Sequence, residues 1–154
     1  MELEALPGRY AVCRLAPDAV QPIWARSAAG ADLLSVTWSD TEMSVVCPEE
    51  RVPTGMAADR GFAALRVRGT LESALNGGFA ALTALLSDAG VPVFTISTQA
   101  TDYLLVSAED ADRARAALGA AGHYLVVPGE AHETAELVGR PSRAVPSATP
   151  AEGR

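Results

Sequence analysis

Two glycines stand where a helix is predicted to begin, and together with the preceding asparagine they suggest a site for a carboxylate. Asn76, Gly77 and Gly78 lead into an apolar run with helical spacing. The first N–H groups of a helix have no partner within the helix and carry partial positive charge, so they attract anions. Glycine also lets a ligand approach the backbone closely. The same glycines would suit close packing of the helix against a neighbouring element, and both interpretations stay open.

A second group of polar residues falls at a predicted turn between two strands and suggests a site for a cation. The carboxylate of Asp102 is suited to a ligand ammonium or guanidinium group. Alternatively, it caps the turn through backbone N–H groups. Ser97, Thr98 and Thr101 offer hydroxyls at the same end of the sheet, and Glu72 lies before the helix start. Each of these four is also typical of a solvated loop or hairpin.

The sequence contains no recognisable catalytic arrangement. A nucleophile needs a base within reach and a third group that orients the base. Cys13 and Cys47 each lie in an apolar, strand-like run, which favours a buried and inert thiol, and we expect His123 at the surface. Motifs of the Gly-x-Ser-x-Gly, phosphate-loop and His-Glu-x-x-His types are missing. We therefore predict that the protein is not an enzyme and holds neither a metal nor a cofactor.

Composition and charge argue against several classes of partner. The 154 residues carry a net charge of −7, and all 12 cationic side chains are arginine. Without a basic run, neither nucleic acid nor an anionic membrane surface is favoured. No apolar stretch approaches the roughly 20 residues that span a bilayer. The acidic segment Met1–Glu4 is not typical of a secretory signal, so we expect a cytoplasmic protein.

Hydrophobic periodicity predicts the elements that position these groups. Strands are predicted at Tyr10–Leu15, Leu33–Trp38, Met43–Cys47, Ala64–Gly69, Val93–Thr98, Asp102–Val106 and Tyr124–Val127. Helices are predicted over 18–28, over 76–89, and between the capping box Ser107–Asp110 and Gly122. The second of these helices repeats apolar residues at Leu75, Phe79, Leu82 and Leu86, which lie on one helical face.

The order of these elements indicates an α+β fold with antiparallel sheets and an imperfect internal duplication. The second half, 63–127, reads β-α-β-β-α-β, which is the ferredoxin-like order. The first half, 6–62, reads β-α-β-β and then loses the pattern, so the first unit is incomplete. Half-sized units bury little surface alone, so we expect the two sheets to share strands or a core. Residues 128–154 are rich in Pro and Ala and are typical of a flexible tail.

Several strings in this order resemble a known family. They are Tyr-Ala-Val-Cys-Arg-Leu (10–15), Ser-Val-Thr-Trp-Ser (35–39), Ser-Val-Val-Cys-Pro-Glu-Glu (44–50), Ala-Leu-Arg-Val-Arg-Gly (64–69), Leu-Asn-Gly-Gly-Phe-Ala-Ala-Leu (75–82) and Phe-Thr-Ile-Ser-Thr-Gln-Ala-Thr-Asp-Tyr-Leu-Leu-Val (94–106). Together they are similar to bacterial ACT-domain proteins related to the CASTOR amino-acid sensors. The regulatory part of aspartate kinases has the same tandem arrangement of ACT units. The resemblance covers about Leu6 to Val127.

The resemblance implies a regulatory protein that binds an amino acid at an interface between ACT units and forms a homodimer. In this family the loop after the first strand and the start of its helix usually hold the ligand. The residues concerned are Gly69, Thr70, Glu72, Asn76, Gly77 and Gly78, with Ser97, Thr98, Thr101 and Asp102 from the hairpin. Thr70 and Glu72 depart from the Pro and Asp that relatives commonly have there.

Two other functions compete with the sensor hypothesis. The first is a ligand-free dimerisation or interaction module of the ACT type, in which the chain's own side chains fill the ligand loop. The second is an enzyme that uses Asp102 or His123 as an acid or base. A cavity beside the loop would favour the sensor over the first rival, and a pH–rate profile would mark the second.

Overall fold

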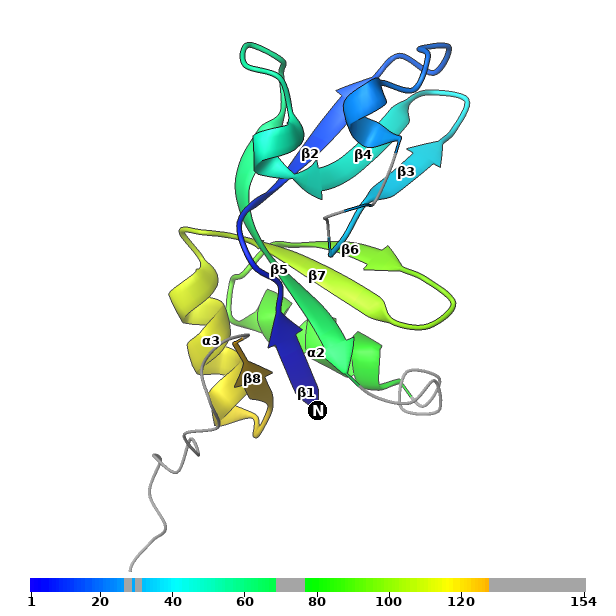
Figure 1. Ribbon diagram of the computed structural model, residues 1–154. Helices are drawn as coiled ribbons and strands as arrows, with labels where there is room; N and C mark the ends of the chain where they lie inside the picture. Colours follow the sequence, from blue (N-terminus) through cyan, green and yellow to red (C-terminus); the bar gives the residue numbers. More distant parts are fainter. Residues whose placement is uncertain (27–28, 30–31, 69–76, 128–154) are drawn as a thin grey trace, which may run out of the picture.

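The computed structural model of the chain describes residues 1–26, 29, 32–68 and 77–127. Its strands are β1 (Glu2–Ala5), β2 (Tyr10–Leu15), β3 (Ser35–Trp38), β4 (Met43–Pro48), β5 (Asp59–Arg68), β6 (Val93–Ser97), β7 (Asp102–Ser107) and β8 (Tyr124–Val126). Its helices are α2 (Gly78–Asp88) and α3 (Ala111–Ala120), with the short 3-10 turns η1 (Ile23–Ala25) and η2 (Glu49–Arg51) (Figure 1). The tail predicted over 128–154 lies outside the described residues.

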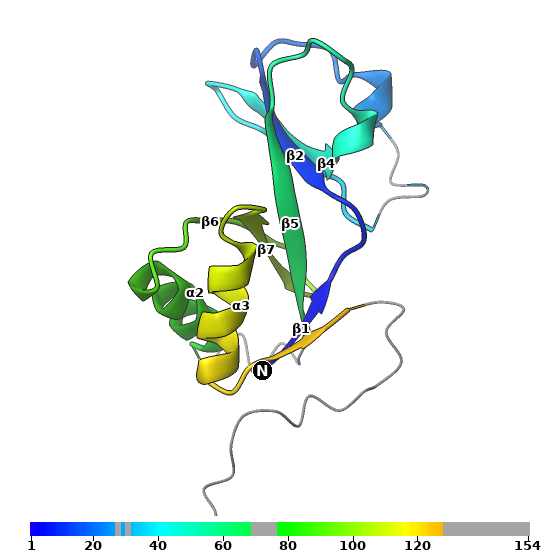
Figure 2. The ribbon, with the colours of Figure 1, turned by 90° about the vertical axis from the view of Figure 1, so that its left-hand side faces the viewer.

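The long strand β5 belongs to both halves of the molecule and joins them (Figure 2). Its first part pairs with β2, and its last four residues pair with β1 on the same edge. On its other edge β5 pairs with β7. The described strands therefore form one hydrogen-bonded network, and the expectation that the two sheets share strands is confirmed.

The first unit is a sheet in the order β3-β4-β2-β5. The helix predicted over 18–28 is wrong in the residues that the structure describes, because Asp18 lies in a turn and only η1 is helical. Pro22 explains the difference. Proline has no N–H, its ring clashes with the carbonyl four residues earlier, and it disfavours helical backbone at Gln21 before it.

The second unit is a sheet in the order β8-β1-β5-β7-β6, with α2 and α3 on one face (Figure 2). The ferredoxin-like order and the α+β class predicted for this part are confirmed. One strand was not predicted. The N-terminal strand β1 lies between β5 and β8, antiparallel to the first and parallel to the second. The chain's start therefore completes a sheet whose other strands come from its second half.

Three clusters of buried side chains hold the described elements together. The helix-side core lies between the second sheet and its helices and contains Leu3, Leu65, Leu82, Leu86, Val91, Leu104, Val106, Ala114 and Leu118. The inter-unit core lies between the two units and contains Leu6, Tyr10, Leu33, Val46, Ala64, Tyr103 and Leu105. The first-unit core contains Ala11, Cys13, Ala25, Met43, Val45, Cys47 and Val52. The buried face predicted for α2 is confirmed at Leu82 and Leu86, and α3 buries Ala114 and Leu118.

Candidate ligand-binding site

The polar residues predicted at the β6–β7 turn do lie together, and each has a defined partner. Ser97 donates its hydroxyl to Oδ1 of Asp102 at 2.6 Å. Thr98 closes the turn, because its Oγ1 accepts from the backbone N–H of Thr101 at 3.1 Å. The same hydroxyl donates to the carbonyl of Thr101 at 2.9 Å. Thr98 therefore stabilises the turn, whereas the hydroxyl of Ser97 orients the carboxylate of Asp102.

Thr101 connects this turn to the end of β5. Its hydroxyl donates to the carbonyl of Val67 at 2.5 Å, one residue before β5 ends at Arg68. The loop that follows β5 contains the predicted site residues Gly69, Thr70, Glu72 and Asn76, and these lie outside the described residues. The described part of the site thus borders the point where that loop leaves the sheet.

The start of α2 has the backbone geometry expected for a helix N-terminus that is free of side-chain caps. Gly77 occupies the N-cap position with φ of +80°, a left-handed conformation that favours glycine. Glycine has no side chain that could cap the helix, and the first turn of α2 contains no acidic residue. The carbonyl of Gly77 accepts the first helical bond, from Ala81 at 3.0 Å. No acidic side chain in the first turn of α2 is therefore available to pair with the N–H groups of Gly78 and Phe79.

The side chains of Ser97 and Asp102 lie on the same face of the sheet as α2. Side chains alternate along a strand, so residues an even number of positions apart share a face. Leu104, two residues from Asp102, belongs to the helix-side core, and Val93, four residues from Ser97, packs against that core. Ile96, between them, packs instead against the inter-unit core. The β6–β7 hairpin thus has two faces. Within one chain, the first unit covers the face that carries Ile96, and Asp102 lies on the other face. Among the described residues, no hydrogen bond or ion pair joins Gly77 or Gly78 to this hairpin.

Sequence reasoning missed a cleft of about 220 Å³ between the two units. It is lined by Ser35 and Thr37 of β3, Ser44 and Val46 of β4, and Phe94, Thr95, Ile96 and Ser97 of β6. Only Ser97 belongs to the predicted site residues. The hairpin of β3 and β4 ends at Pro48 and β6 begins at Val93, so no local pattern brings these strands together.

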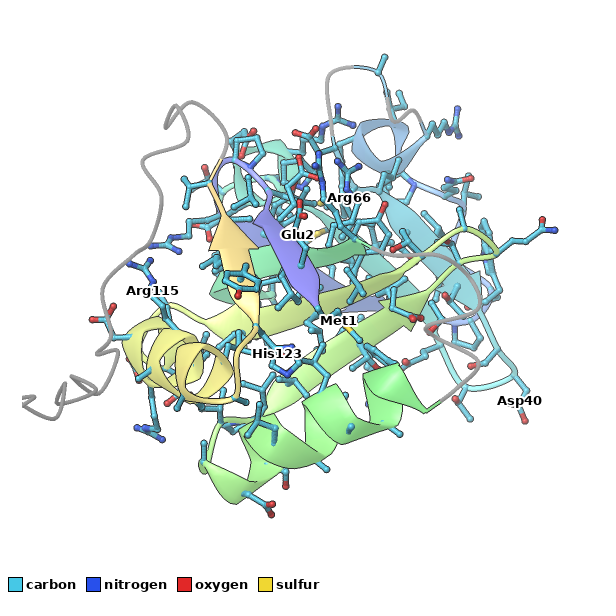
Figure 3. All side chains as sticks on the ribbon, turned by 90° about the horizontal axis from the view of Figure 1, so that it is seen from below. Met1, Glu2, Asp40, Arg66, Arg115 and His123 are labelled. Atoms are coloured by element: carbon cyan, nitrogen blue, oxygen red, sulfur yellow. The ribbon has the colours of Figure 1, made fainter. Side chains whose placement is uncertain are left out.

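The described residues include three further side chains with reactive groups, Cys13, Cys47 and His123. Cys13 and Cys47 are free and buried, and burial raises the pKa of Cys47 to about 11, so both predictions of a buried thiol are confirmed. His123 is half-buried rather than at the surface, beside Met1 (Figure 3), and its Nδ1 is buried without a hydrogen-bond partner. In the part of the chain that the structure describes, no cluster of His, Cys, Asp and Glu could hold a metal ion. No described helix is long and apolar enough to cross a membrane.

Comparison with known families and structures agrees with this fold. Residues 57–120 match the model of the ACT domain, and residues 8–55 match a second model that describes an N-terminal domain. A search of curated proteins finds no match. The match to the ACT domain over residues 57–120 includes β5, α2, β6, β7 and α3 of the second unit described above.

Solved structures show the same architecture along most of the chain. The protein Atu0741 from Agrobacterium tumefaciens is 29% identical, with 86% of this chain and 97% of that chain covered and a TM-score of 0.76. The ligand-free regulatory subunit of aspartate kinase from Thermus thermophilus is 15% identical, with 76% and 94% covered and a TM-score of 0.53. The corresponding subunit from Thermus flavus is 16% identical, with 76% and 98% covered and a TM-score of 0.51. At such identities, the two kinase subunits show a shared fold.

Proposed function

We propose that this chain is a regulatory protein that binds an amino acid at the end of the second unit's sheet. The observation that supports this function most directly is the Ser97–Asp102 pair, bonded at 2.6 Å on the α2 face of an ACT domain. An oriented carboxylate is a suitable partner for a ligand ammonium group. ACT domains are regulatory and commonly bind amino acids, and this chain carries such a domain over 57–120.

The other charged group of an amino acid needs a donor-rich partner. The start of α2 supplies backbone N–H groups and the positive end of the helix dipole, and Gly77 and Gly78 leave the backbone accessible. In this proposal the ligand carboxylate binds there and the ammonium group binds Asp102. Gly69, Thr70, Glu72 and Asn76 contribute from the loop between them, while Ser97, Thr98 and Thr101 shape the hairpin end.

We further propose that the interface between ACT units at this site comes from a second copy of the chain. The first unit packs against the hairpin face that carries Ile96, Tyr103 and Leu105, so it does not cover Asp102. A ligand at Asp102 would therefore contact another ACT unit only across a homodimer. Ligand binding would then shift the monomer–dimer equilibrium, with a coupling of typically 1–3 kcal/mol.

A thermal-shift screen against the twenty amino acids and ornithine tests the proposal. An amino acid at about 100 times its Kd should stabilise the protein by roughly 2.7 kcal/mol, which raises the unfolding midpoint. Asp102→Asn should abolish the shift, because it removes the charge that faces the ammonium group. Glu109→Gln, at an exposed position just after β7, is the matched control and should keep the shift.

The opposite results would favour a different function. If no amino acid shifts the midpoint while the protein remains folded and dimeric, the ligand-free dimerisation module becomes the better account. If an amino acid does bind but Asp102→Asn retains the full shift, the ammonium group lies elsewhere and the site assigned here is wrong.

A further inference from the structure

The cleft between the two units lies on the opposite face of the β6–β7 hairpin from Asp102, and it shares only Ser97 with the proposed amino-acid site. Its inner end is formed by Val46 and Ile96, which pack in or against the inter-unit core. The other lining residues bear hydroxyl groups, except for the exposed Phe94. The cleft therefore has an apolar end between the units and a mostly polar mouth.

One wall is a face of the β3–β4 hairpin. Ser35 pairs with Val46 and Thr37 pairs with Ser44 across the two strands, so these four side chains share one face of the sheet. Farther out on the same face, Arg14 and Glu42 form an ion pair of 2.7 Å. Arg14 and Glu42 thus neutralise each other, and the wall offers a ligand uncharged hydroxyl groups.

The other wall is β6, which among the described strands pairs along one edge only, with β7. The second edge of such a strand presents backbone N–H and C=O groups in alternation. Phe94 and Ile96 point to the cleft side, and Phe94 is 38% exposed. The side chains of Thr95 and Ser97 point to the α2 face instead, so these two residues border the cleft along the edge of β6.

We infer that this cleft is a second binding site, for an uncharged small molecule that carries amide groups and one compact apolar group. None of the eight described lining residues is charged. A ligand charge buried there would lose its hydration without gaining an ionic partner, which disfavours free amino acids. Amide groups match both the hydroxyls of Ser35, Thr37 and Ser44 and the open edge of β6, as an added strand does.

The size of the cleft limits the ligand. At about 220 Å³ it is smaller than the roughly 300–1,000 Å³ typical of sites for drug-sized molecules. A blocked amino acid with an aliphatic side chain has the required features, with its side chain at the end formed by Val46 and Ile96. Such a ligand touches both units and would bias the angle between them.

Chemical-shift mapping on the full-length, ¹⁵N-labelled protein tests this inference. The probes are N-acetyl-leucinamide, free leucine as its charged counterpart, and glucose as an uncharged molecule without amides. We expect N-acetyl-leucinamide alone to shift the backbone signals of residues 35–37, 44–46 and 94–96, which lie outside the proposed amino-acid site. No shifts at these positions, equal shifts with leucine, or shifts with glucose instead would each overturn the inference.

Variants within the cleft separate binding there from binding at the amino-acid site. Thr37→Val removes a hydroxyl with little change in shape and should weaken binding roughly fivefold, as expected for one lost hydrogen bond. Ser44→Leu fills the polar mouth and should abolish binding, with a native-like spectrum as the check on folding. Ser87→Ala, exposed on α2, and Asp102→Asn should bind N-acetyl-leucinamide normally. Loss of binding in Asp102→Asn, or unchanged binding in both cleft variants, would contradict the second site.

Discussion

At the scale of single residues, Glu4 is the most heavily bonded carboxylate that the structure describes. Its Oε2 atom accepts hydrogen bonds from Arg66 and from Arg68, whose Nε lies 2.9 Å away. Hydrogen bonds from Arg66, and then from Arg68, lower the pKa of Glu4 below its ordinary value. Glu2 adds a weaker contact to Arg68 at 3.3 Å (Figure 3 shows Glu2 and Arg66). These bonds tie the unpredicted strand β1 to β5.

Glu4→Gln should destabilise the protein by about 1 kcal/mol at neutral pH, since the arginines lose a charged acceptor that is only partly shielded from water. The unfolded chain binds a proton here more readily than the folded protein. The contribution of Glu4 is therefore complete above its ordinary pKa of 4.5 and is lost as pH falls through the lower folded value. Urea unfolding from pH 7 to pH 3 measures this. Glu2→Gln, at a 47% exposed side chain, is the control and should cost less.

His123 should respond to acid in a higher pH range than Glu4. Burial, and then the positive charge of the Met1 amino group, lower the pKa of His123 below its ordinary value of 6.5. The folded protein therefore holds fewer protons at this ring than the unfolded chain does. Its contribution to stability is present above pH 6.5 and is lost as pH falls through the folded pKa. An NMR titration of the imidazole should show a midpoint below 6.5, and a midpoint at or above that value would contradict the burial of Nδ1.

At the scale of elements, the same substitution should have opposite effects at two glycines. Gly77 caps α2 with φ of +80°, where a Cβ is strained, so Gly77→Ala should cost about 1 kcal/mol. Gly119 lies inside α3, where a Cβ meets nothing within 4 Å. Gly119→Ala should therefore stabilise the protein by up to about 1 kcal/mol. Denaturant midpoints of the two variants decide this, and a change of the same sign in both would be inconsistent with the backbone described here.

Local sequence patterns predicted most of the helices and strands, because a few neighbouring residues are enough to indicate each of them. The run from Val93 to Val106 has two strand-like apolar stretches around a turn of polar residues, and it forms the hairpin β6–β7. Pro22 is the residue in the sequence that argues against a helix over 18–28. The strand β1 has only four residues, and its partners lie sixty or more positions away in the sequence. Such pairing has no local signature.

Local sequence patterns also predicted one part of the candidate site and not the other. Asp102 and Ser97 were predicted because a short hairpin fixes which residues meet at its end. The cleft was not predicted, since it requires Thr37 and Phe94, from different units, to line one space. Which sheet face each unit covers follows from the inter-unit core, whose members are spread from Leu6 to Leu105.

At the scale of the whole molecule, the shared strand β5 and the inter-unit core should make the two units unfold together. Leu105 is fully buried in that core, so Leu105→Ala should cost about 2–5 kcal/mol. Ile23→Ala, at a residue 82% exposed, is the control and should change stability little. Unfolding followed by the tryptophans of the first unit and by backbone circular dichroism should give coincident transitions. Separate transitions would show that the units are independent.

The central claim is that an amino acid binds at Asp102 on the α2 face of the second unit. A crystal structure of the protein grown with the amino acid selected by the thermal-shift screen tests it most directly. We predict the ligand ammonium group within hydrogen-bonding distance of the Asp102 carboxylate and the ligand carboxylate at the N–H groups that begin α2. An amino acid found instead in the cleft between Thr37 and Phe94, or anywhere remote from Asp102, would contradict the account.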